Sequence, residues 1–298
     1  MKPLILTVLF LIFSGISVFA AEEIMFEGYY RVTASGKPIG YTIQRYTFDS
    51  TKKQFTSKYY VHAKSPVGMV TESLTAVSND QFQPLSYQYT SQVGTQLKSI
   101  DAKFEQTKTG QVMSYTVANG QQRQTLQQTL SKDVFLSTFQ TYLMLQKGFN
   151  PGTKFDFEAI SEEDGQVQKG QALIKQEPGF EDKGILRILS RFKNIESVAN
   201  ANIKGEVIIV ESPVQKIKQV LTPVAADATK GFNFNTKTIR YVFGNIPTGQ
   251  VNQMAMNKSQ PEPANNSASA QPSEQESAAP MNNIKINPPK AGQQAQGN

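Results

Sequence analysis

The stretches that decide the fold are Leu85-Ser86-Tyr87-Gln88-Tyr89-Thr90 and Ile100-Asp101-Ala102-Lys103-Phe104-Glu105. In both, apolar side chains occupy every second position and polar side chains fill the positions between them. A period of two is typical of a strand with one buried and one wet face, and such strands belong to antiparallel sheets. The alternation recurs at Met113–Val117, Phe155–Ala159 and Ile239–Phe243. We therefore expect a mainly antiparallel β fold, in the form of a curved sheet, half-barrel or barrel-like structure.

Turn residues separate the predicted strands. Ala34-Ser35-Gly36-Lys37, Asn119-Gly120 and Asp164-Gly165 each lie between two alternating segments, which predicts three hairpins. In the segment Pro38–Phe48 the apolar residues change parity after Ile43. A β-bulge near Gln44-Arg45 would explain this change.

The sequence favours one or two helices beside the strands. Ser131 is a candidate N-cap, Phe135, Phe139, Tyr142 and Leu143 follow at helical spacing, and Gly148 is a candidate end. This predicts a helix over residues 131–148. Residues 185–195 carry apolar side chains that fit a basic amphipathic helix or a poorly alternating strand, and both alternatives stay open.

The N-terminal segment resembles a secretory signal peptide. Lys2 precedes the apolar run Leu4–Phe13, and Val18-Phe19-Ala20 supplies compact residues at the positions that a signal peptidase reads. We expect cleavage between Ala20 and Ala21, and a periplasmic or secreted protein with no transmembrane span after removal of the signal. The alternative is an uncleaved anchor, although the run is short for a span.

Composition divides the chain into three parts. Residues 1–20 form the predicted signal peptide, and residues 21–249 form one antiparallel β domain. Residues 250–298 are dominated by Asn, Gln, Ala, Ser and Pro and contain no aromatic residue. Such a segment buries too little apolar surface to offset its ordering entropy, so we expect a disordered low-complexity tail.

The composition also argues against several classes of function. The chain contains no cysteine, which excludes cysteine nucleophiles, zinc–thiolate sites and a lipid anchor on cysteine. The net charge is +6, without a dense basic stripe, so nucleic acid is not an expected partner. A lipid, an amphiphile or another envelope protein fits better.

Few residues are candidates for catalysis. His62 is the only histidine and has no recognisable catalytic partner in the sequence. Glu162-Glu163-Asp164 precedes Gly165 without the ligand spacing of a calcium loop, which favours a solvated hairpin tip. Asp156 and Glu158 share a strand face, which would suit a carboxylate-based glycan hydrolase only with a facing partner. We therefore assign no catalytic residue, metal or cofactor, and expect a protein that is not an enzyme.

Ligand binding is the function that the residues favour. The chain holds 18 Phe and 11 Tyr, and an aromatic-rich antiparallel sheet can enclose an apolar cavity. Tyr87, Tyr89 and Phe104 are the candidate ligand-binding residues. The alternatives are a structural or adhesion scaffold that acts through sheet edges and the tail, and, less favoured, the glycan hydrolase.

The first predicted hairpin carries a resemblance. Its sequence, Gly28-Tyr29-Tyr30-Arg31-Val32-Thr33-Ala34-Ser35-Gly36-Lys37-Pro38-Ile39-Gly40-Tyr41, contains a Tyr-x-Val strand, a Gly-containing turn and an Ile-Gly pair. It resembles the opening of a group of uncharacterised bacterial periplasmic antiparallel-β proteins. The resemblance implies a curved sheet distantly like the half-barrels of lipoprotein carriers, and it implies no catalytic residue.

Overall fold

The fold is described from a computed structural model, which places residues 22–180, 183–249 and 251–252. The predicted signal peptide, residues 1–20, lies outside the described residues. The predicted tail, residues 250–298, also lies outside them, except for residues 251–252. Within the range, every strand belongs to one sheet. The described part of the chain contains no helix that is both long and apolar enough to cross a membrane.

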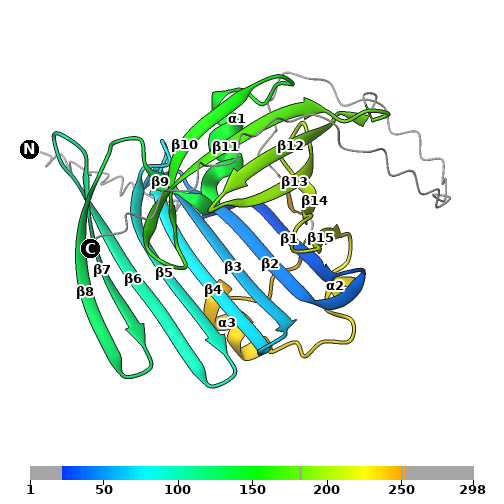
Figure 1. The fold of residues 1–298 in the computed structure, drawn as a ribbon, viewed down its shortest axis with the longest axis horizontal. Coiled ribbons are helices and arrows are strands. Elements are labelled where there is room, and N and C mark those ends of the chain that lie inside the picture. Colours follow the sequence, from blue (N-terminus) through cyan, green and yellow to red (C-terminus); the bar gives the residue numbers. More distant parts are fainter. Residues whose placement is uncertain (1–21, 181–182, 250, 253–298) are drawn as a thin grey trace, which may run out of the picture. The chain divides into compact units, whose positions relative to one another are not determined.

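The sheet is mainly antiparallel and strongly curved, which confirms the predicted fold class (Figure 1). Its strands pair in the order β8-β7-β6-β5-β4-β3-β2-β1-β15-β14-β13-β12-β11-β10-β9, and β16 pairs with β1 beside this path. Among the strand pairs that the structure describes, only the short β9·β10 pairing is parallel. The strands are β1 (Glu23–Ala34), β2 (Lys37–Asp49), β3 (Gln54–Ser65), β4 (Gly68–Asn79), β5 (Pro84–Val93), β6 (Gln96–Gln106), β7 (Gln111–Asn119), β8 (Gln122–Leu130), β9 (Phe135–Leu136), β10 (Lys154–Ser161), β11 (Gln166–Gln176), β12 (Ile185–Phe192), β13 (Ile195–Asn202), β14 (Val207–Ser212), β15 (Ile217–Thr222) and β16 (Val251–Asn252).

The three predicted hairpins are present. Ser35 and Gly36 join β1 to β2 with φ of 48° and 75°, a left-handed backbone that glycine adopts without strain. Gly120 begins the turn from β7 to β8, and Gly165 ends the turn from β10 to β11. The turn residues therefore specify the pairing of neighbouring strands.

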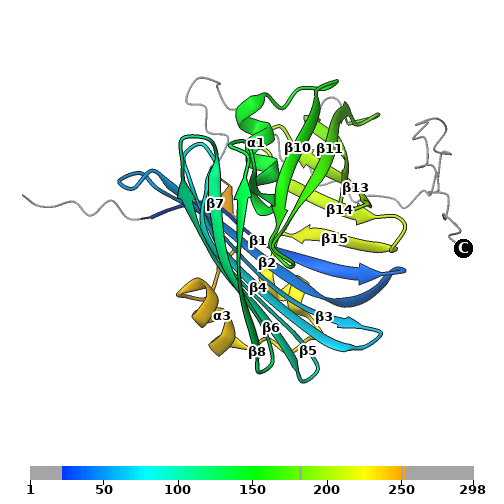
Figure 2. The same ribbon diagram turned by 60° about the vertical axis from the view of Figure 1, so that its left-hand side comes forward.

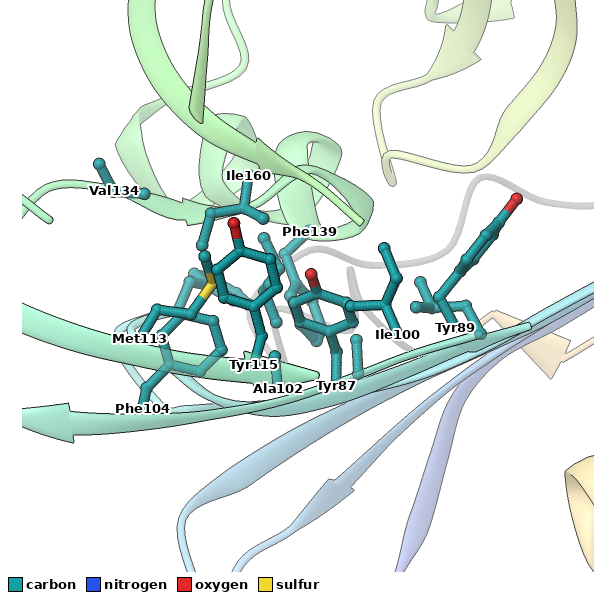
Figure 3. Close-up of a cluster of buried hydrophobic side chains, with 14 of the residues drawn as sticks. Tyr87, Tyr89, Ile100, Ala102, Phe104, Met113, Tyr115, Val134, Phe139 and Ile160 are labelled. Atoms are coloured by element: carbon teal, nitrogen blue, oxygen red, sulfur yellow. The ribbon is translucent and has the colours of Figure 1, made fainter. Parts of the chain in front are cut away.

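One face of the sheet, here called the inner face, carries the main core. Alternate side chains of β5, β6 and β7 point towards β9, β10 and α1 (Gln140–Lys147). Figure 3 shows Tyr87 and Tyr115 on the side of the sheet that faces Ile160 of β10. Phe139 and Tyr142 pack against Tyr46 of β2 with ring centroids 6.1 and 4.3 Å apart. The predicted helix over residues 131–148 is therefore too long: residues 135–136 form β9 and residues 137–139 form a 3₁₀ turn.

The other face, here called the outer face, is covered by the C-terminal helices α2 (Ala225–Thr229) and α3 (Thr236–Phe243). Figure 2 shows α3 and α1 on opposite sides of the sheet. The prediction of a strand at Ile239–Phe243 is wrong. The Asn235 side chain accepts a hydrogen bond from the Thr238 N–H and so caps a helix. Ile239 and Phe243 are buried one turn apart, whereas Tyr241 is 90% exposed.

The predicted bulge at Gln44-Arg45 is also wrong. The pairing of β2 with β3 is regular from Gly40 to Asp49. The change of parity has another cause, because β2 is covered on both faces. Tyr41 and Ile43 pack on the outer face, and Tyr46 packs on the inner face.

The segment over residues 185–195, for which helix and strand were both open, is a strand hairpin. β12 runs from Ile185 to Phe192, and Lys193 and Asn194 turn with φ of 53° and 60° into β13. Alternate residues Leu186 and Ile188 are buried, while the basic Arg187 and Arg191 lie on the other face.

Candidate ligand pocket

A pocket of about 330 Å³ opens on the inner face, where the central strands meet α1. Its wall is built by segments that are far apart in the sequence. The lining residues are Phe26 and Tyr30 of β1, Gln44 and Tyr46 of β2, Tyr59 of β3, Ser137, Thr138, Gln140, Thr141 and Tyr142, Glu162 and Glu163 of the β10–β11 turn, Gly205 of the β13–β14 turn, Val207 and Val210 of β14, and Gln219 of β15.

Aromatic side chains form one side of the pocket. The ring centroid of Phe26 lies 6.5 Å from that of Tyr30 and 6.2 Å from that of Tyr46. The Tyr30 hydroxyl donates to the Val207 carbonyl at 3.0 Å, and the Tyr46 hydroxyl donates to the Thr138 carbonyl at 2.7 Å. These bonds fix the rings, because a buried phenol without a partner would lose about 1–3 kcal/mol.

A bulge shapes the part of the wall that β14 supplies. The β13·β14 register shifts between Asn200 and Ala201, so that Asn200 pairs with Ile209 and Ala201 with Val207. The extra residue in β14 places Val207 and Val210 on the same face, although they are three positions apart. Val210 pairs with Gln219 of β15, and both side chains line the pocket.

Glu162 is a buried carboxylate in the pocket wall, with only 3% of its surface exposed. Its Oε2 accepts a hydrogen bond from the Ser137 hydroxyl at 2.5 Å, and its Oε1 accepts one from the Thr138 N–H at 3.0 Å. Burial raises the pKa of Glu162 from 4.5 to about 7, although these two hydrogen bonds oppose the rise. Glu162 therefore changes charge near neutral pH. The prediction of a solvated tip at 162–164 is wrong for this residue.

The other two acidic residues of the turn are paired with a lysine. Lys193 Nζ lies 2.8 Å from Glu163 Oε1 and 2.6 Å from Asp164 Oδ2, and it donates to the Ser161 hydroxyl at 2.9 Å. These partners outweigh desolvation and raise the pKa of Lys193. Lys193 is therefore held as the cation of an ion pair with these two carboxylates.

The predicted ligand-binding residues lie on the same face as the pocket but outside its wall. Tyr87, Tyr89 and Phe104 are nearly fully buried in the inner core, and Tyr87 and Phe104 pack with ring centroids 6.2 Å apart. None of the three lines this pocket. Their alternation predicted the buried face, but the pocket lies further along the sheet, where β3, β2, β1, β15 and β14 contribute to its wall.

Comparison with known proteins supports the fold. No protein-family model matches the chain, and no curated protein matches it. The solved structure of a β-barrel-like protein of the domain of unknown function DUF1849 from Brucella abortus superposes with a TM-score of 0.50 and 8% identity, over 67% of this chain and 96% of that one. A DUF1089 family protein from Pseudomonas aeruginosa gives a TM-score of 0.34 and 10% identity, over 58% of this chain and 90% of that one.

The chain thus has the fold of a β-barrel-like domain of unknown function. This confirms the resemblance to uncharacterised β proteins that the first hairpin indicated. The structure also explains one element of that hairpin, the Ile39-Gly40 pair. A Cβ atom on Gly40 would lie 2.1 Å from the His62 carbonyl oxygen, so only glycine allows β3 to approach this closely.

Of the remaining catalytic candidates, Asp156 and Glu158 share one pocket, and His62 does not line it. His62 lies on β3 against the Tyr41 ring, with centroids 5.5 Å apart, and burial lowers its pKa. Asp156 and Glu158 line a second, open pocket of about 610 Å³ with Lys169 and Arg191, and Glu158 Oε1 lies 3.9 Å from Lys169 Nζ. Among the described residues no group of three or more His, Cys, Asp or Glu side chains is arranged to hold a metal ion.

Proposed function

We propose that this protein binds one single-chain amphiphile in the inner-face pocket and acts as a carrier or receptor without catalysis. The observation that supports this most directly is a pocket whose wall combines apolar side chains with a few polar ones. Phe26, Val207 and Val210 suit an acyl chain, and Gln44 and Glu162 suit a headgroup. Small-molecule sites combine apolar walls with a few polar groups in this way.

The size of the pocket limits the ligand. A volume of about 330 Å³ lies at the lower end of the range for small-molecule sites. One acyl chain fits this volume better than a lipid with two or more chains. The ligand class is therefore a single-chain amphiphile.

The test compares two tryptophan variants of neighbouring residues on β14. Val210→Trp fills the pocket, whereas Ile209→Trp places the same side chain on the opposite face of the strand. Isothermal titration with dodecyl maltoside, dodecyltrimethylammonium and dodecanoate, each below its critical micelle concentration, measures binding. We expect one-to-one binding of at least one amphiphile, retained in Ile209→Trp and lost in Val210→Trp. Failure of all three to bind, or equal binding by both variants, would overturn the proposal.

We also propose that the chain is exported, with cleavage between Ala20 and Ala21. The apolar run Leu4–Phe13 and the compact residues before Ala21 support this. When the full chain is expressed in a bacterial host, the intact mass in the periplasmic fraction should match residues 21–298. A mass that retains residues 1–20 would contradict export by cleavage.

A scaffold role through a sheet edge is the second candidate, because β8 is an unusually open edge strand. Within the described residues β8 pairs only with β7, and that pairing runs without a register shift from Asn119 to Gln111. The strand has nine residues, no proline and one charge, Arg123. Edge strands are commonly protected by charges, prolines or bulges. A second copy could therefore extend the sheet in antiparallel pairing about Leu126.

Like charges on this edge test the scaffold role. Thr125 would face Gln127 of the second copy, so the double variant Thr125→Lys, Gln127→Lys places lysines opposite each other. Both side chains are exposed, which preserves the fold. Sedimentation velocity should show a dimer that this variant disrupts and that Gln88→Lys, Gln92→Lys on β5 leaves intact. A monomer in all three proteins would remove this candidate.

A further inference from the structure

We propose that the amphiphile bound in the inner-face pocket carries a positively charged ammonium headgroup. This inference rests on the proposed function and adds the charge of the ligand. It concerns selectivity, which is a property that the shape and volume of the pocket leave open.

The charged residues of the pocket wall are all acidic. The lining residues include Glu162 and Glu163 but no lysine or arginine. This bias runs against the composition of the chain, which has 30 basic and 24 acidic residues. A pocket that selected a carboxylate or phosphate headgroup would be expected to present an arginine or lysine to it. An anion in this wall would instead meet the like charges of Glu162 and Glu163.

The aromatic side of the pocket favours a cation as well. Tyr30, Tyr46, Tyr59 and Tyr142 surround the space together with Phe26, and Tyr142 meets Tyr46 edge-on at 4.3 Å between centroids. The faces of aromatic rings attract cations, and quaternary ammonium groups are commonly held by several rings at once. Aromatic faces and carboxylates together complement an ammonium group.

Glu72 and Glu206, which do not line the pocket, add to the field of Glu162 and Glu163. Burial is the largest cause of the raised pKa of the Tyr59 hydroxyl, and the carboxylates of Glu72, Glu162 and Glu163 raise it further. The Glu206 carboxylate contributes to the raised pKa of Tyr30 and of Tyr142. The phenols therefore stay neutral and the carboxylates carry the charge.

Two lysines lie near the pocket and reduce this field without reversing it. Lys193 is bound by Glu163 and Asp164, and Lys98 Nζ donates to the Glu163 carbonyl at 2.8 Å. Against these two positive charges stand the carboxylates of Glu72, Glu162, Glu163 and Asp164. Neither lysine lines the pocket. The balance at the headgroup position is negative when Glu162 is ionised.

The test compares ligands that share a dodecyl chain and differ in headgroup charge. Isothermal titration at pH 8 and low salt should show that dodecyltrimethylammonium binds at least about tenfold more tightly than dodecyl maltoside or dodecanoate. Glu163→Gln should lower the affinity for dodecyltrimethylammonium about three- to tenfold and leave the affinity for dodecyl maltoside unchanged. Glu163 is 45% exposed, so this variant should fold. Asp101→Asn, on the exposed face of β6, is the matched control and should change neither affinity.

The outcomes separate this inference from the proposed function. Binding of all three amphiphiles with equal affinity, abolished by Val210→Trp, would overturn the charge preference and leave the pocket as a ligand site. Tighter binding of dodecanoate would also overturn the charge preference. Absence of any binding would overturn the proposed function itself. A preference for the cation that Val210→Trp leaves unchanged would place the binding elsewhere and contradict both.

Discussion

The Ser137 hydroxyl donates a hydrogen bond of 2.5 Å to the buried carboxylate of Glu162, and this bond joins the β10–β11 turn to the segment that leads into α1. The two residues lie 25 positions apart, and the neighbouring Thr138 N–H binds the same carboxylate. Glu162 thus connects two segments that line the pocket, the β10–β11 turn and residues 137–138. Because its pKa is raised to about 7, the strength of this connection depends on pH.

The first prediction concerns stability against pH. The pKa of Glu162 is about 7 in the folded protein and 4.5 as the ordinary value, so between these values the folded state binds the proton more tightly. The free energy of unfolding should therefore fall as pH rises from about 4.5 to 7, by up to about 3 kcal/mol from this group. In Glu162→Gln the amide oxygen can accept from the Thr138 N–H and the amide nitrogen can donate to the Ser137 hydroxyl oxygen, so the variant lacks the charge and should remove this loss.

Urea unfolding of both proteins at several values between pH 5 and pH 8 measures the effect. The difference between wild type and Glu162→Gln isolates this carboxylate from His62, whose pKa is lowered by burial and which acts in the opposite direction. The variant should gain stability over the wild type as pH rises. Parallel stability curves would show that Glu162 titrates at its ordinary pKa.

The second prediction extends the charge inference to pH. A bound cation favours the ionised form of Glu162, so dodecyltrimethylammonium should bind more tightly at pH 8 than at pH 6, and the dependence should vanish in Glu162→Gln. The charged and titratable groups around Glu162 are Glu163, Asp164, Lys193, Lys98, Glu72, Tyr46, Tyr59 and Tyr87. Titration calorimetry at the two pH values measures it. The same affinity at both would contradict contact between the headgroup and Glu162.

The third prediction concerns the ion pair that holds the C-terminal segment on the outer face. Arg45 Nε lies 2.5 Å from Glu27 Oε2, and the same guanidinium donates to the Phe243 carbonyl and the Asn245 side chain. Both partners are buried, so Arg45→Met should cost about 3–5 kcal/mol by leaving the Glu27 carboxylate without its cationic partner. Hydrogen exchange of α3 should accelerate. The double variant with Glu27→Gln should cost less than the two single changes together, and strict additivity would contradict direct coupling.

The fourth prediction concerns Gly40. A methyl group there would lie 2.1 Å from the His62 carbonyl oxygen and 2.5 Å from the Ala63 Cα, so backbone must move. Gly40→Ala should lower the free energy of unfolding by at least about 2 kcal/mol. Gly36→Asn is the control, because asparagine tolerates the φ of 75° at this turn. Equal, small effects of both variants in urea unfolding would contradict the close approach of β2 and β3.

The fifth prediction separates core from pocket. Phe104 is buried in the inner core but does not line the pocket. Phe104→Leu should cost about 1–2 kcal/mol of stability and leave the affinity for the dodecyl amphiphiles unchanged. A large loss of affinity without loss of stability would show that Phe104 contacts the ligand and would contradict this prediction.

The alternation of the sequence was sufficient to predict the sheet and its faces. Tyr87, Tyr89 and Phe104 point to the inner face as their period of two requires. The alternation failed at Ile239 and Phe243, because a spacing of four fits both a strand face and one helical turn. Tyr241, between them, resolves the ambiguity only in the structure, where it is exposed.

The pocket could not be predicted because it depends on the curvature of the sheet. Phe26 and Gln219 lie almost 200 positions apart in the sequence, and they line one space because β15 pairs with β1. The shared face of Val207 and Val210 follows from a bulge that leaves no mark in the apolar pattern. Glu162 precedes a predicted turn, and only the fold shows that Ser137 and Thr138 cover it.

Native mass spectrometry tests the binding claim most directly, because it weighs the protein together with any ligand retained from the cell. The protein purified from a periplasmic extract should carry one additional species of the mass of a single-chain amphiphile. The species should be present in Ile209→Trp and absent from Val210→Trp, which fills the pocket. Protein of bare mass that also takes up none of the three dodecyl amphiphiles, or a species retained by Val210→Trp, would contradict a ligand site in this pocket.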